Sequence, residues 1–167
     1  MAGAGLEVPR RADLGVRPTG RKGTAVTKDL VRQFIDSQQL AVVSSISSVD
    51  GKPQSALVGI AIAPNFEIVF DTVRSSRKYR NLIENPAVSF VIGCAGAVTV
   101  QYEGEARELS GSDLVALQPV YFAKWPDGPE RLQWPGITYI AVKAHWIRYS
   151  DFSATPPVIE ELVFAAK

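Results

Sequence analysis

Short apolar runs separated by turn residues recur along most of the chain, and they predict β-strands. Asp50-Gly51 is a hairpin signal between two such runs, and Pro64-Asn65 marks a turn before the run that ends at Phe70. The predicted strands cover residues 40–47, 53–62, 68–70, 87–92, 97–109 and 137–149. Six strands with mostly hairpin-like connections and few helices indicate a mainly β (α+β) fold, a six-stranded antiparallel barrel rather than a parallel α/β sheet.

Three short helices complete the predicted elements. Thr27 is a suitable N-cap for the first helix, and the second covers residues 76–84, where Asn85-Pro86 stops it. The third begins at Ser110 or Ser112 and continues an amphipathic pattern. The helices therefore accompany the barrel and do not form layers of their own.

The last predicted strand, residues 137–149, alternates in polarity. Strict alternation puts Ile140, Val142, Ala144 and Trp146 on one face, and Tyr139, Lys143, His145 and Ile147 on the other. His145 thus shares a face with Lys143, and we expect a surface or structural role for it.

The junction between the strand ending at Phe70 and the following helix carries hydroxyls and cations. Thr72, Ser75 and Ser76 lie where the backbone must turn from extended to helical, and Arg77 and Lys78 follow in the first helical turn. Backbone N–H groups already make that end of a helix positive, so cations there are unfavourable unless an anion compensates them. The pattern favours a phosphate site over a plain basic helix with a serine cap.

Composition limits the functions open to the chain. Its 167 residues suit one domain, and a formal net charge of +1 argues against a nucleic-acid binder. One cysteine, Cys94, and one histidine exclude a disulfide framework and a Cys/His zinc cluster, and Cys94 is expected to be inert. Glu103, Glu105 and Glu108 are interpreted as a solvated strand face rather than a metal site. No membrane segment or signal peptide is evident, so we expect a cytoplasmic protein.

The first 25 residues differ from the rest in composition. They are rich in glycine and arginine and lack an apolar pattern, which indicates an extended basic N-terminal arm over residues 1–25 before a domain over residues 26–167. Two interpretations remain for the arm: a disordered tail, or a segment laid over a partner subunit.

Several short motifs resemble one known family when they are taken together. They are Asp50-Gly51-Lys52-Pro53-Gln54-Ser55, Phe70-Asp71-Thr72, Ser76-Arg77-Lys78, Asn81-Leu82, Glu84-Asn85-Pro86 and Val88-Ser89-Phe90. The combination is similar to the pyridoxamine 5'-phosphate oxidase-like proteins, which are flavin-binding split β-barrels. The resemblance covers residues 39–109 and extends more weakly to residues 144–152.

The resemblance implies a homodimer with FMN at the subunit interface. It implies that the phosphate lies near Thr72, Ser76, Arg77 and Lys78, the same residues that the helix-dipole argument selects. The chain departs from the family in the strand at 54–62, which lacks the Arg and Lys that better-studied members contribute to the phosphate.

Further flavin contacts follow from the same resemblance. A glutamine used toward the flavin falls near Thr99, and Gln101 takes its place if the register shifts. Val58 and Gly59 are small enough to let the flavin ring approach the strand backbone. In the aromatic segment 119–136, either the side chains cover a flavin or substrate, or they fill the barrel mouth or dimer seam.

The expected function is therefore that of an FMN-binding oxidoreductase acting on a small or planar substrate. No catalytic residue is assigned, because the chemistry belongs to the flavin ring. Two alternatives stay open: a deazaflavin-dependent reductase on the same barrel, and a non-catalytic flavin-binding or sensing protein. Neither nucleic acid nor a membrane is expected as a partner.

Overall fold

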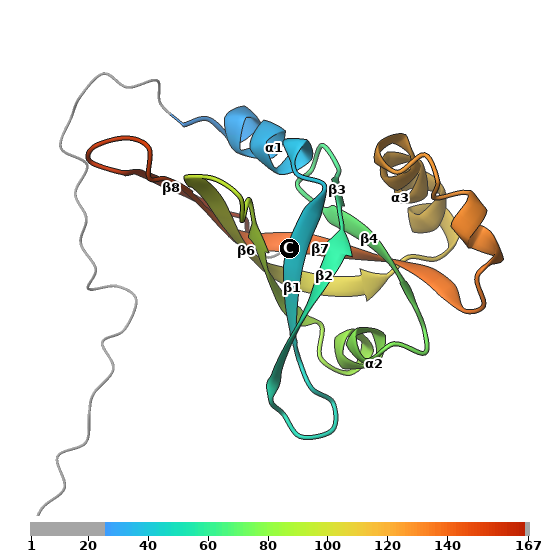
Figure 1. Ribbon diagram of the computed structural model, residues 1–167. Helices are drawn as coiled ribbons and strands as arrows, with labels where there is room; N and C mark the ends of the chain where they lie inside the picture. The colour runs from blue at the N-terminus through green and yellow to red at the C-terminus, as the bar shows by residue number, and fades with distance from the viewer. Residues whose placement is uncertain (1–25, 166–167) are drawn as a thin grey trace, which may run out of the picture.

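The computed structural model describes residues 26–165, and the predicted arm at 1–25 lies outside them. One curled antiparallel sheet dominates the molecule (Figure 1). Its strands are β1 (Leu40–Ile46), β2 (Pro53–Gly59), β3 (Ala61–Ile62), β4 (Ile68–Val73), β5 (Ala87–Ile92), β6 (Val98–Glu108), β7 (Ile137–Asp151) and β8 (Val158–Val163). The mainly β, antiparallel split-barrel prediction is confirmed, with eight strands in place of six.

The strand count differs at two places. The predicted strand at 53–62 divides at Ile60: β2 pairs with β1, whereas β3 pairs with β4. The hydrogen-bonded order is β2-β1-β5-β6-β7-β4-β3, so the short link through Ile60 joins the two ends of the order and closes the barrel. β8 was missed because its sequence does not alternate, and only Leu162 in it is buried.

A bulge in β7 overturns the predicted alternation of that strand. Glu103 of β6 pairs with Trp146, but the next residue, Gly104, pairs with Ala144, so His145 is an extra residue in the strand register between β7 and β6. An extra residue reverses which side chains point inward beyond it. Ile147 therefore lies in the core with Ala144, and the prediction that Trp146 shares a face with Ala144 while Ile147 lies on the other was wrong.

Two apolar clusters fill the structure. The larger lies inside the barrel and includes Phe70, Phe90 and Tyr102, whose rings meet edge to face. The smaller lies between the outer side of β4 and β7 and helix α3 (Gly111–Lys124), with Tyr121 at its centre. No helix within residues 26–165 is long and apolar enough to cross a membrane.

The predicted helix starts agree with the structure. Thr27 caps α1 (Lys28–Ser37), Ser76 caps α2 (Arg77–Glu84), and Ser110 precedes α3. Figure 1 shows α1 and α2 at opposite ends of the barrel. The 3-10 helix η2 (Glu130–Gln133) follows α3 and leads into β7.

Candidate functional site

The junction between β4 and α2 is held by a hydroxyl pair. Thr72, which is buried near the end of β4, lies with its Oγ1 3.0 Å from the Oγ of Ser76. The same Ser76 oxygen accepts the backbone N–H of Tyr79, so it caps the helix. The chain thus turns from strand to helix with fixed geometry, and Arg77 and Lys78 follow immediately.

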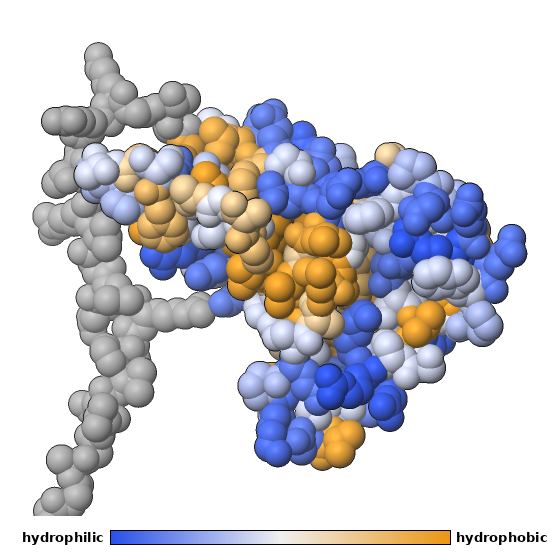
Figure 2. Space-filling view, viewed as in Figure 1, coloured by the Kyte–Doolittle hydropathy of each residue, from blue (hydrophilic) through white to orange (hydrophobic). Residues whose placement is uncertain are grey.

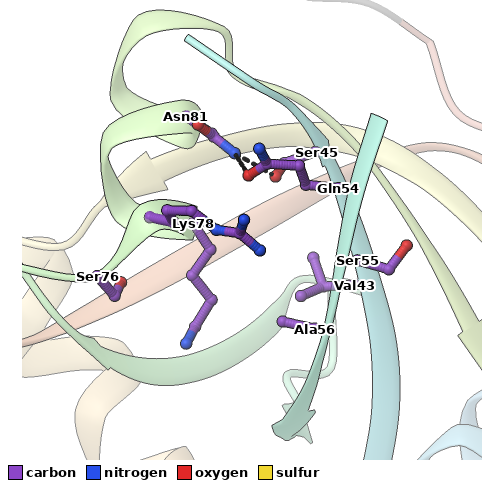
Figure 3. A pocket seen from close by; sticks show the side chains of 9 residues that line it. Val43, Ser45, Gln54, Ser55, Ala56, Ser76, Lys78 and Asn81 are labelled. Carbon is purple, nitrogen blue, oxygen red and sulfur yellow. Dashed lines mark hydrogen bonds between the residues drawn. The ribbon is translucent and has the colours of Figure 1, made fainter. Parts of the chain in front are cut away.

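A cleft of about 130 Å³ opens between α2 and the β1–β2 hairpin (Figure 3). Its lining comprises Val43, Ser45, Gln54, Ser55, Ala56, Ser76, Arg77, Lys78 and Asn81. Figure 3 shows Lys78 extending from the helix into the space that faces Ala56. Segments far apart in sequence therefore meet around the two predicted cations.

Asn81 fixes the position of α2 against the hairpin. Its side chain is buried, and its Nδ2 donates to Ser45 Oγ at 3.1 Å and to Gln54 Oε1 at 3.0 Å. Its Oδ1 accepts the backbone N–H of Ser48 at 3.1 Å. Removal of a buried amide that has three partners leaves each of them unsatisfied, so Asn81 holds the cleft in shape. Asn81 and Gln54 both stand in motifs that carry the family resemblance, but no role was predicted for either of them.

The cations of α2 are Arg77, Lys78 and Arg80. Within residues 26–165, no acidic side chain forms an ion pair with Arg77, Lys78 or Arg80, and the first turn of α2 contains no acidic residue. Three like charges near the positive end of a helix repel one another and the helix dipole. The site therefore favours an anion.

Glu108 supports α2 from behind the cleft. Its Oε1 accepts from Arg74 Nη2 and Thr138 Oγ1, each at 2.6 Å, and its Oε2 accepts from Tyr79 Oη at 2.7 Å. Burial tends to raise its pKa, but the hydrogen bonds outweigh that effect and lower it. The interpretation of Glu108 as part of a solvated strand face was wrong, because the fold brings three donors to it.

Five of the predicted flavin contacts do not line this cleft, and one of them, Thr72, lies beside it through its contact with Ser76. Ser75 is exposed, and Val58 belongs to the barrel core. Gly59 lies beneath Trp125, whose ring would be 2.7 Å from a Cβ added there. Gln101 is exposed, and it pairs with Val91 and Arg148 on the sheet.

The aromatic segment packs against the barrel. Tyr121 is fully buried, and the ring of Trp125 stacks on it at 6.3 Å. Trp125 Nε1 donates to the carbonyl oxygen of Ile60, the residue that separates β2 from β3. Arg131 lies over both rings and 3.3 Å from Asp71. These contacts favour the packing interpretation of this segment, with only Trp134 among its tryptophans largely exposed.

The residues of the cleft fit the phosphate of a flavin better than they fit its ring. Ser76, Arg77 and Lys78 offer donors and charge to a phosphate. Pockets that enclose a drug-sized ligand have volumes of about 300 to 1,000 Å³, so this cleft in one chain is too small to enclose the whole molecule. The lining contains no His, Cys, Met or Tyr, the side chains that commonly ligate haem iron.

Comparison with solved structures identifies the same fold in other proteins. A heme binding protein from Mycobacterium smegmatis gives a TM-score of 0.68 at 14% identity, with 79% of this chain and 55% of that protein covered, so the chain spans little more than half of its length. A conserved hypothetical protein from Mycobacterium tuberculosis gives a TM-score of 0.65 at 20% identity, with 90% of this chain and 97% of that protein covered.

A third structure is a pyridoxamine 5'-phosphate oxidase-related, FMN binding protein from Nostoc punctiforme. It gives a TM-score of 0.59 at 11% identity, with 81% of this chain and 91% of that protein covered. No curated protein matches the sequence. The family described as pyridoxamine 5'-phosphate oxidase matches residues 27–151, which is most of the chain. The chain therefore belongs to the pyridoxamine 5'-phosphate oxidase family.

Proposed function

We propose that this protein binds FMN and acts as a flavin-dependent oxidoreductase, with the flavin phosphate held by Ser76, Arg77 and Lys78. The observation that carries the proposal is the cleft at the start of α2, where the cations have no acidic partner among the described residues. Membership of the family and the likeness to an FMN binding protein support the same ligand.

We further propose a homodimer that completes the site. The outer face of the sheet carries exposed apolar side chains in adjacent strands: Leu57 is 62% exposed, Leu40 49% and Val91 43%. Leu57 and Val91 both pair with Val42, so they lie on one face of the sheet. Figure 2 shows an apolar patch over β1 and β2. A second copy on this face would bury the patch and add walls to a cleft that is too small alone.

The flavin, when bound, would supply redox chemistry, and this chain would hold and orient it. Asn81 keeps α2 at a fixed place against the hairpin, and Thr72 and Ser76 fix the start of the helix. Apolar contacts between the two copies would keep water from the ring. The substrate in this proposal is small or planar.

A non-catalytic binding protein is the second candidate, and one observation favours it. β2 contributes Gln54, Ser55 and Ala56 to the cleft but no cation, since its sequence is PQSALVG. Each charge-assisted hydrogen bond is worth about 1.5 to 3 kcal/mol, so a phosphate held by α2 alone is bound less tightly. A deazaflavin coenzyme is a further ligand of the same kind for this cleft.

Titration with FMN, followed by flavin fluorescence, tests the proposal. We expect saturable binding and a loss of affinity of about 100-fold in the double variant Arg77→Ala with Lys78→Ala, because two charged donors are removed. Arg32→Ala, on α1 at the opposite end of the barrel (Figure 1), is the control for loss of a cation away from the cleft and should bind FMN as the unmodified protein does. Equal affinity of the double variant and the control would refute the phosphate site.

Sedimentation tests the dimer separately. Leu57→Arg places a charge in the apolar patch, and we expect a monomer with weakened FMN binding. A parent protein that is monomeric at micromolar concentration would contradict the dimer.

Turnover of a reduced nicotinamide donor separates the oxidoreductase from the non-catalytic protein, which would bind FMN without catalysing its reduction.

A further inference from the structure

A second cleft, of about 200 Å³, adjoins the first. It shares Gln54, Arg77 and Asn81 with the first cleft, and it extends between the β1–β2 hairpin loop and the outer turn of α2. Its remaining lining is Ser47, Ser48, Val49, Asp50 and Arg80. The two clefts therefore lie on either side of Arg77, and together they form one groove along α2.

The charge of the second cleft is set by two arginines. Arg77 and Arg80 are three residues apart on α2, so their side chains project from neighbouring positions of the helix surface. Neither forms an ion pair with an acidic side chain in residues 26–165. The one acid in the lining, Asp50, already pairs with Lys52 at 3.0 Å. Two adjacent like charges without a counter-charge are stabilised by an anion placed between them.

The hairpin wall of this cleft is held in place by its own hydrogen bonds. Ser47 Oγ accepts the backbone N–H groups of Val49 and Asp50, and the N–H of Ser48 donates to Asn81. These backbone donors are occupied, and the two guanidinium groups are the charged donors in the lining of this cleft. A wall fixed in this way presents the arginines to a ligand with little further ordering cost.

We propose that the second cleft binds a second anionic group, a phosphate or a carboxylate, through Arg77 and Arg80. The inference rests on the proposed function only in that the first cleft would take the flavin phosphate. Two sources share this chemistry: the second phosphate of a flavin dinucleotide, and the anionic group of a separate substrate.

Binding of FMN, FAD and inorganic phosphate to the full chain distinguishes these sources. For Arg80→Ala we expect FMN affinity within about twofold of the unmodified protein, because Arg80 lines only the second cleft. If the second anion belongs to the cofactor, FAD affinity falls about tenfold or more in this variant, as expected for one lost charge-assisted hydrogen bond. If it belongs to a substrate, FAD and FMN behave alike, and the FMN-loaded protein binds inorganic phosphate in an Arg80-dependent manner. Arg32→Ala is again the control.

The result that overturns the inference is an Arg80→Ala variant with unchanged affinity for FAD and for inorganic phosphate. If the parent protein binds no flavin, the proposed function fails. Titration with inorganic phosphate then still tests whether the second cleft binds an anion. Calorimetric titration of inorganic phosphate should then show binding that is lost in Arg80→Ala and retained in Arg32→Ala. Absence of phosphate binding to the parent protein would overturn the second site as well.

Discussion

Replacement of Glu108 by glutamine tests how the barrel holds α2, the helix that carries the cations of the cleft. Glu108 lies at the end of β6, and its carboxylate accepts hydrogen bonds from Arg74, Tyr79 and Thr138. The variant keeps the shape of the side chain, removes its charge, and turns an NH₂ group toward donors. Tyr79 belongs to α2, so the loss acts directly on this helix.

The expected loss in the free energy of unfolding follows from how exposed each hydrogen-bond donor to Glu108 is. The side chain of Arg74 is 56% exposed, so solvent screens its ion pair with Glu108 and that ion pair contributes little to stability. Thr138 is buried and Tyr79 is partly buried, and each hydrogen bond to the carboxylate is worth about 1 kcal/mol or more. We expect Glu108→Gln to lower the free energy of unfolding by about 2 kcal/mol at pH 7.

The pKa shift of Glu108 determines how its contribution to stability changes with pH. The pKa of Glu108 is lowered in the folded protein from its ordinary value of 4.5, so the folded state favours the charged form. The stabilisation is present above that value and is lost as the pH falls through the lower folded pKa. Urea unfolding measured between pH 7 and pH 3 should therefore show the difference between parent and variant shrinking below about pH 4.5.

Glu105→Gln is the matched control, because its side chain on the same strand is 62% exposed and lies 3.8 Å from His145. We expect a change below about 0.5 kcal/mol for it. The reasoning is refuted if Glu108→Gln behaves as the control does, or if its effect is the same at pH 3 and pH 7.

Two further predictions concern the core. Tyr102→Phe should lower the free energy of unfolding, measured in urea, by about 1 to 2 kcal/mol, because the buried hydroxyl of Tyr102 donates to the carbonyl oxygens of Phe66 and Val142. An unchanged free energy would mean that water takes the place of the hydroxyl. Gly104→Ala should destabilise by about 2 kcal/mol or more, because the new Cβ would overlap the carbonyl oxygen of Lys143 beside the bulge. A normal melting temperature would show that the bulge relaxes.

Local signals were enough for the helix starts and for most of the strands. Capping residues such as Thr27 and Ser76 act within three residues along the chain, so the sequence predicted these helix starts correctly. The serine and the cations at 76–78 are consecutive, and the predicted anion site needed nothing from elsewhere. The bulge at His145 and strand β8 were missed, because both depend on pairing with β6 or β7 rather than on local pattern.

The sequence by itself determined an antiparallel barrel and a helix whose first turn carries Arg77 and Lys78. Only the tertiary structure decided what surrounds them. It placed Gln54 and Asn81 at the wall, buried Thr138 beside Glu108, and put Val58 in the core. The physical reason is that caps and charges act over a few residues, whereas cleft walls form where strands distant in sequence are brought together by burial of apolar side chains.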